Sequence, residues 1–148
     1  MQGNRYREVL SPPLWLLAFI YFLLFSMVIA IWAALSRRIT QASFVLSLLI
    51  LILVAVTSRS TIYVDDSHLR IGKAQIERKY LGEALALTRE EMALIRTRDA
   101  DPAAFLALKF WQSRGVKVEV KDLRDSTPYW LISSKHPEEL AKSLNASL

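Results

Sequence analysis

The apolar and polar residues of this chain follow two patterns, which meet near Thr57. Residues 14–56 are almost wholly apolar, whereas residues 57–148 mix apolar and charged side chains. Long apolar segments are typical of membrane-spanning helices, and short alternating segments are typical of half-buried strands. We therefore expect an N-terminal membrane anchor followed by one small domain at 58–148.

The first apolar segment, residues 14–35, carries no charge. As a helix it would reach about 33 Å, enough for a hydrocarbon core of about 30 Å. A proline pair precedes it, and Trp15 and Trp32 are spaced to reach both interfacial aromatic belts. The segment is too long for the apolar core of a cleaved signal peptide, and a second one follows at once, so we interpret it as an anchor.

The second apolar segment, residues 39–56, would reach about 27 Å as a helix, which suffices where flanking side chains snorkel. Arg37 and Arg38 separate it from the first segment. One continuous helix would place both arginines mid-membrane, at a cost of about 2.5 to 3.5 kcal/mol each. A hairpin that turns at 36–38 avoids that cost and is the arrangement we expect.

Small residues recur every four positions on both predicted helices. They are Ser26, Ala30 and Ala34 on the first helix and Ser43 and Ser47 on the second. Such stripes let helices approach closely, either in a dimer or within one hairpin. We favour packing within the hairpin, and the oligomeric state stays open.

Positive charge flanks the hairpin on the side of both chain termini, beginning with Arg5, Arg7 and Arg59. Because basic residues gather on the cytoplasmic side of membrane proteins, we place the segment 1–13 and the C-terminal domain in the cytoplasm. The two arginines of the turn oppose this orientation. We expect a multi-pass protein of the cell (plasma) membrane with cytoplasmic termini.

Beyond residue 60 the pattern predicts strands and two short helices. β-Branched, aromatic or alternating residues predict strands at 61–64, 68–71, 75–81, 84–87, 116–120 and 128–133. A capping box from Thr88 to Glu91 predicts a helix with Met92 and Ile95 facing inward. A proline at the first position, followed by acidic residues, predicts a C-terminal helix at 137–145.

Residues 103–110 fit two patterns, because alanine and leucine favour a helix while Phe105, Ala107 and Lys109 alternate as in a strand. We favour a helical turn that leads into a strand. The expected fold is a two-helix transmembrane hairpin followed by a small α+β domain. Its antiparallel strands would form a barrel or sandwich capped by the C-terminal helix.

Composition and charge exclude several classes of function. Of the net charge of +5, residues 1–56 carry +3 and the domain carries +2 from interspersed basic and acidic residues, so we expect no nucleic-acid partner. The chain has no cysteine, which excludes disulfides, thiolate metal sites and cysteine nucleophiles. Its four glycines form no phosphate-binding loop, and no serine lies in a nucleophile elbow.

The polar residues that could carry chemistry have a simpler structural interpretation. His68 and His136 lack carboxylates at the spacing of a metalloprotease. The aspartate pairs 65–66 and 122/125 lie in predicted turns, where aspartate usually bonds its own backbone. We therefore predict no catalytic, cofactor-binding or metal-binding residue and no cofactor.

The aromatic residues of the domain are candidates for an interaction surface. Tryptophan, tyrosine and arginine often anchor protein interfaces. The candidates are Trp111, Arg114, Tyr129 and Trp130. A strand tryptophan more often fills a core, so two interpretations stand side by side.

Basic residues early in the domain form a second candidate surface, which would face lipid. Near an anionic bilayer each contributes about 1 kcal/mol. The candidates are Arg59, Arg70, Lys73, Arg78 and Lys79. The alternative interpretation is ordinary charge that determines the topology.

Several segments together resemble a known family. They are the residues 6–8 before the proline pair, 101–106, 110–111, 127–134 and 137–140. They resemble DUF3093, a family of actinobacterial membrane proteins of unknown function. That resemblance implies a topology but no activity. The strand count and closing helix are also similar to bacterial PH-like domains, which often adjoin two-helix membrane anchors.

These observations favour a membrane-anchored, non-enzymatic interaction module with a protein partner in or at the membrane. An alternative is a module that binds anionic lipid or serves the cell envelope through its basic residues. An enzyme with an unrecognised site is a third hypothesis. The lipid bilayer is the one partner that all three share.

Overall fold

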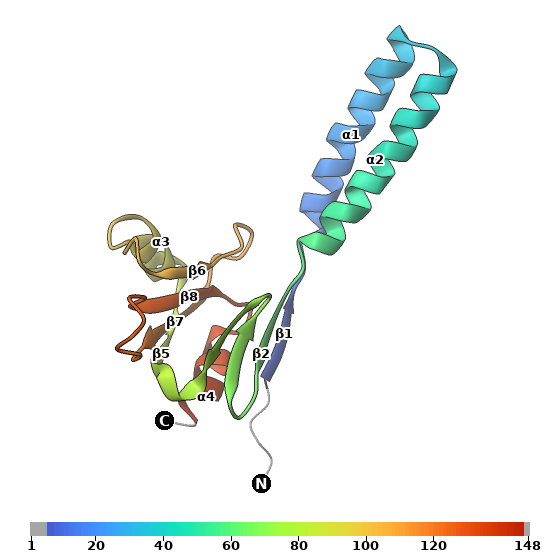
Figure 1. The fold of residues 1–148 in the computed structure, drawn as a ribbon. Coiled ribbons are helices and arrows are strands. Elements are labelled where there is room, and N and C mark those ends of the chain that lie inside the picture. Colours follow the sequence, from blue (N-terminus) through green and yellow to red (C-terminus); the bar gives the residue numbers. More distant parts are fainter. Residues whose placement is uncertain (1–5, 147–148) are drawn as a thin grey trace. The chain divides into compact units, whose positions relative to one another are not determined.

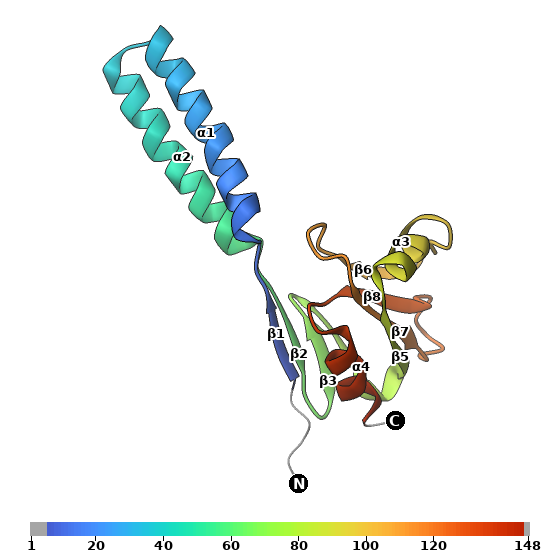
Figure 2. The same ribbon diagram turned by 180° about the vertical axis from the view of Figure 1, so that it is seen from behind.

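The computed structural model describes residues 6–146, which form two compact units (Figure 1; Figure 2). One unit is the helical hairpin, Ser11–Ser60. The other joins Thr61–Leu148 to the N-terminal residues up to Leu10. The domain expected at 58–148 therefore also includes part of the segment 1–13, of which residues 1–5 lie outside the described residues.

The hairpin consists of helices α1 (Leu14–Ala34) and α2 (Arg37–Thr57). Each has 21 residues, which corresponds to about 32 Å, and each is long and apolar enough to cross a membrane. Most of their large apolar side chains are exposed, so neither is a buried helix of this domain.

The second helix begins two residues earlier than expected. Arg37 and Arg38 form its first turn, and the N–H groups of Ile39 and Thr40 both donate to the carbonyl of Ser36. The turn is therefore restricted to residues 35–36. Both arginines still lie at the end of the hairpin. The second apolar helix is therefore longer than the segment 39–56 that the sequence pattern indicated.

The small-residue stripes differ in their environment. Ser47 is buried, and its hydroxyl donates to the carbonyl of Ser43, so the stripe of α2 faces α1. From α1 the buried residue is Val28, whereas Ser26 and Ala30 are exposed. Packing within the hairpin thus uses only one of the two stripes.

The first sheet of the domain has the strand order β1-β2-β3-β4. Its strands are β1 (Tyr6–Leu10), β2 (Ser60–Val64), β3 (His68–Ile71) and β4 (Ala74–Glu77). Gly72, at φ 60°, opens the two-residue loop between β3 and β4, a position that favours glycine. The strand β1 was not expected from the sequence, because its partner β2 follows only after the whole hairpin.

The second sheet has the order β5-β7-β8-β6. Its strands are β5 (Leu81–Leu87), β6 (Phe105–Ala107), β7 (Gly115–Val120) and β8 (Tyr129–Ser133). The expected antiparallel pairing holds for β5–β7 and β7–β8, but β6 pairs with β8 in parallel. The segment 103–110 contains the expected strand, β6, at the edge of the sheet, but a hydrogen-bonded turn without helix precedes it.

The strand expected at 75–81 is interrupted. β4 ends at Glu77, and a single 3₁₀ turn, η1 (Arg78–Tyr80), precedes β5. β5 in turn is longer than the expected 84–87, with an irregularity between Leu81 and Ala84. The chain uses this turn to pass from one sheet to the other.

The two sheets and the C-terminal helix α4 (Pro137–Asn145) share one hydrophobic core. Fully buried residues come from the first sheet (Ile62, Leu69), from the second (Val118, Ile132) and from α4 (Leu140). The fold is therefore the expected helical hairpin plus a small α+β domain.

A second, smaller cluster lies under helix α3 (Arg89–Thr97) on the other face of the second sheet. The predicted capping box is present, since Thr88 and Glu91 exchange hydrogen bonds. Met92 of α3 is fully buried against Tyr129 and Leu131. This helix covers part of the outer face of the sheet and creates the pocket described below.

Candidate functional site

Tyr129 and Trp130 are neighbours on β8 and therefore point to opposite faces of the sheet. Trp130 is 7% exposed and packs in the main core, with its ring centroid 4.3 Å from that of Phe105. Tyr129 belongs to the smaller cluster, and its hydroxyl accepts a hydrogen bond from the N–H of Asp101. The structure thus assigns Trp130 to packing and leaves Tyr129 next to a pocket.

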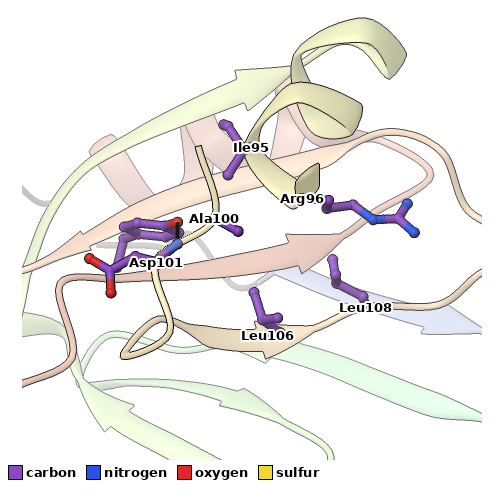
Figure 3. Close-up of a pocket in the computed structure, with 7 residues that line it drawn as sticks. Ile95, Arg96, Ala100, Asp101, Leu106 and Leu108 are labelled. Atoms are coloured by element: carbon purple, nitrogen blue, oxygen red, sulfur yellow. Dashed lines mark hydrogen bonds between the residues drawn. The ribbon is translucent and has the colours of Figure 1, made fainter. Parts of the chain in front are cut away.

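The pocket lies between α3, β6 and β8 and has a volume of about 110 Å³ (Figure 3). Ile95 and Arg96 approach it from α3, and Leu106 and Leu108 lie on the opposite wall. Ala100, Asp101 and Tyr129 complete the lining. Segments far apart in the sequence therefore form one concave surface.

The pocket is small and mostly apolar. Sites for small-molecule ligands measure about 300–1,000 Å³, whereas a cavity of about 150 Å³ holds a benzene-sized group. The space therefore fits one apolar side chain better than a cofactor. Arg96 and Asp101 supply one positive and one negative charge in its lining. Leu106, 55% exposed, extends the apolar surface along the edge strand β6.

Trp111 and Arg114 lie away from Tyr129, in the segment 108–114 between β6 and β7, which we call the aromatic loop. Phe110 is 70% exposed and packs edge-on against Trp111, with ring centroids 4.9 Å apart. Lys109 places its Nζ 5.5 Å from the centroid of the Trp111 ring. The loop therefore presents one protruding aromatic ring next to a cation.

Hydrogen bonds fix the aromatic loop to the segment that follows β8. The Gln112 amide donates to the carbonyl of Ser134 at 2.7 Å, and the Arg114 guanidinium donates to the carbonyl of Lys135 at 3.2 Å. The Ser134 N–H returns a bond to the carbonyl of Arg114. These bonds hold the aromatic loop against the segment that follows β8.

A buried carboxylate that the sequence analysis missed joins β1 to this same segment. Glu8 is 7% exposed and accepts hydrogen bonds from the Ser134 hydroxyl and the Lys135 N–H, each at 2.6 Å. The Tyr6 hydroxyl donates to it at 2.8 Å. Burial and the adjacent carboxylate raise the pKa of the Tyr6 hydroxyl. In the sequence, the only indication of this contact is a charged residue, Glu8, within the alternating residues of β1.

Arg78, expected to face lipid, is buried at 8% exposure. Its guanidinium donates to the carbonyls of Ser143 and Leu144 at the end of α4 and to that of Asp65. Burial lowers the pKa of this guanidinium. A cation at a helix C-terminus satisfies carbonyls that have no partner within the helix. Arg78 is therefore a structural residue.

The other basic candidates lie on the surface. Lys79 forms an ion pair with Glu77, with its Nζ 2.6 Å from the carboxylate. Arg59, just before β2, Arg70 on β3 and Lys73 in the turn after β3 are exposed. Unlike Arg78, these residues have side chains that are open to solvent.

The aspartates act as turn residues. Asp65 accepts hydrogen bonds from the N–H groups of Ser67 and His68, which hold the pKa of its carboxyl below the usual value. Asp122 and Asp125 bond the backbone two residues onward in the same manner. Within residues 6–146, no three histidine, aspartate or glutamate side chains gather to hold a metal ion.

Comparison with known proteins gives a family but no activity. The model of the family described as "Protein of unknown function (DUF3093)" matches residues 5–144, which is nearly the whole chain. No curated protein and no solved structure matches it. The similarity to PH-like domains therefore stays a prediction.

Proposed function

The chain belongs to the DUF3093 family, whose function is not established, and we propose that it is a membrane-anchored, non-enzymatic interaction module. In this proposal the hairpin spans the plasma membrane with both termini in the cytoplasm. The domain binds a protein partner in or at the membrane through the pocket between α3 and β6. The observation that carries the proposal is this pocket, which is mostly apolar and has one positive and one negative side chain, Arg96 and Asp101, in its lining.

The exposed surface of the hairpin supports the membrane anchor. An apolar patch of more than a few hundred Å² is rare on soluble monomers. Here large apolar side chains are exposed along both helices, Trp15 and Trp32 near the two ends of α1 among them. Tryptophan at both ends of an apolar helix suits the two interfaces of a bilayer.

The pocket supports a peptide as the ligand. Its volume of about 110 Å³ matches one branched aliphatic side chain. The edge strand β6 lies beside it, and an edge strand can pair with an extended segment of a partner. Arg96 and Asp101 would then bond polar groups on either side of the inserted side chain.

Chemical labelling tests the anchor and its orientation. Because the chain has no cysteine, single cysteines at Ser36 in the turn and Ser126 in the β7–β8 loop can be labelled without background. With a membrane-impermeant maleimide on intact cells, we expect labelling at position 36 only, and at position 126 only after permeabilisation. If washing the membranes with alkaline carbonate released the protein, the anchor would be contradicted. Labelling of position 126 on intact cells, and of position 36 only after permeabilisation, would contradict the orientation.

Photo-crosslinking tests the pocket. We place a photoreactive amino acid next to it, at Ala100 in the full-length protein, and isolate crosslinked partners from cell membranes. The variant Leu106→Glu should remove the crosslink, because a charge would enter the apolar wall. Leu123→Glu is the matched control, because Leu123 is a fully exposed leucine in the loop between β7 and β8.

The isolated partner allows a direct measurement of affinity. Burying one leucine-sized side chain contributes about 1.5 to 3 kcal/mol, so its replacement by alanine in the partner should weaken binding about tenfold or more. The proposal fails if Leu106→Glu and Leu123→Glu retain the same partner with the same affinity.

A further inference from the structure

The most exposed aromatic side chain of the described domain is Phe110, at the tip of the aromatic loop, with 70% of its surface open. The half-buried Trp111 supports it from below. Aromatic residues flanked by cations are typical of protein surfaces at the bilayer interface, where the ring enters the headgroup region.

Three cations lie in this loop and in the segment bonded to it: Lys109, next to Trp111, Arg114, and Lys135 after β8, whose carbonyl accepts a hydrogen bond from Arg114. None of the three forms an ion pair with another residue in the described range 6–146. The one carboxylate bonded to this segment, Glu8, is buried and engaged by the Ser134 hydroxyl and the Lys135 N–H. The charge presented next to Phe110 is therefore positive.

Covalent connectivity limits how far this surface can be from the membrane. The Lys135 Nζ lies 3.5 Å from the carbonyl oxygen of Val9 on β1. Four residues lie between Val9 and Leu14, the first residue of α1, so their Cα atoms are five steps along the chain and at most about 18 Å apart. Within the domain, both views show the loop between β6 and β7 on the same side as the C-terminal end of β1 (Figure 1; Figure 2).

We propose that the aromatic loop is a second membrane contact of this protein, in which Phe110 enters the bilayer interface while Lys109, Arg114 and Lys135 bind anionic headgroups. This inference rests on the membrane anchor of the proposed function and is independent of its peptide pocket. The cations of this contact differ from the basic residues predicted from the sequence, of which Arg78 is buried and Lys79 is paired with Glu77.

We favour the lipid bilayer as the occupant, because the short covalent link between β1 and α1 keeps this loop within reach of the membrane that the hairpin is proposed to span. A contact by one ring and three cations would be weak for a free protein in solution. With a tether this short, the contact becomes intramolecular at a high effective concentration. The loop would thereby fix the orientation of the domain on the membrane.

The test uses the full-length protein in vesicles of phosphatidylcholine, alone or with a third of phosphatidylglycerol. An environment-sensitive fluorophore is attached to a cysteine at Ser113, an exposed position of the aromatic loop that leaves Phe110 in place. The matched control carries it at Leu123, and an anchor control carries it at Leu23 in the middle of α1. A doxyl lipid quenches from the bilayer, and iodide quenches from water.

We expect the lipid to quench the probes at positions 113 and 23 but not the probe at 123, most strongly in anionic vesicles at low salt. Phe110→Ser should remove the quenching at 113. Lys109→Gln and Arg114→Gln should each lower the contact equilibrium about fivefold, the effect of one basic residue near an anionic surface.

Each other outcome overturns the inference in a recognisable way. Lipid quenching at position 23 with none at 113 refutes the loop contact and leaves the anchor intact. An absence of quenching at both positions refutes the anchor as well. Protection of position 113 from iodide without lipid quenching would indicate a protein contact there instead of lipid.

Discussion

Replacing Arg78 by methionine separates the structural role found here from the lipid-facing role that its sequence suggests. Methionine keeps the length and apolar character of the side chain but has no donor. Arg78→Met therefore leaves three carbonyls without their partner, those of Asp65, Ser143 and Leu144, at donor distances of 2.8 to 3.0 Å.

The structure sets the size of the expected effect. A carbonyl left without a partner away from water costs about 1 kcal/mol or more, and loss of a cation at a helix C-terminus adds about 0.3 to 1 kcal/mol. Removing the charge also ends the cost of burying it, which offsets part of the loss. We expect the free energy of unfolding of the domain to fall by about 2 to 4 kcal/mol, or about 4 to 8 °C in Tm per kcal/mol.

Urea denaturation of the full-length protein in mild detergent measures this change. The fluorescence of Trp130, buried in the core, follows unfolding of the domain, while the tryptophans of the hairpin give a constant background. Lys79→Met is the matched control, because Lys79 is the next residue and lies on the surface. Its midpoint should equal that of the unmodified protein.

The two variants give opposite patterns under the two interpretations. If Arg78→Met unfolds at the same urea concentration as Lys79→Met, the buried contacts to α4 do not stabilise the domain. If Arg78→Met instead lowers binding to anionic vesicles with unchanged stability, the lipid-facing interpretation is right and the structural one is wrong.

Three further predictions concern other contacts of the domain. Glu8→Ala should lower the free energy of unfolding by about 2 to 4 kcal/mol in the same urea assay, since the buried Ser134 hydroxyl loses its acceptor, and Glu8→Gln should lose less. Gly115→Ala should cost about 1 to 3 kcal/mol, because a Cβ there meets the carbonyl of Ile132 on β8 and the side chain of Met92 on α3; an unchanged midpoint would contradict this close approach to β7. The hydrogen bonds that lower the pKa of Asp65 stabilise the folded domain at pH values above the usual aspartate pKa, and this stabilisation is lost as pH falls through the lowered pKa. The variant Asp65→Asn keeps an oxygen acceptor but cannot titrate. The pH at the midpoint of acid unfolding should therefore shift in this variant.

The sequence by itself determined the elements whose signals are local. Two long apolar segments separated by charge predict a helical hairpin, because a run of this length without charge has few other solutions. The capping box at Thr88 and the proline at position 137 each mark a helix start through bonds within one turn. Alternation in Gly115–Val120 predicts a strand in the same way.

Elements that depend on distant partners were decided by the tertiary structure. β1 is a strand because β2 lies beside it, although the whole hairpin separates the two in sequence. β6 has only three residues and is held by its parallel neighbour β8, so its own composition fitted both a helix and a strand.

The candidate sites show the same division. Composition identifies aromatic and basic residues, but one step along β8 moves a side chain from Tyr129 beside the pocket to Trp130 in the core. Arg78 and Lys79 are chemically alike in sequence, and only the position of α4 makes one a buried cap while the other stays on the surface. Local hydrogen bonds and periodicity depend on residues that are neighbours in the sequence, whereas burial depends on which distant segments pack together.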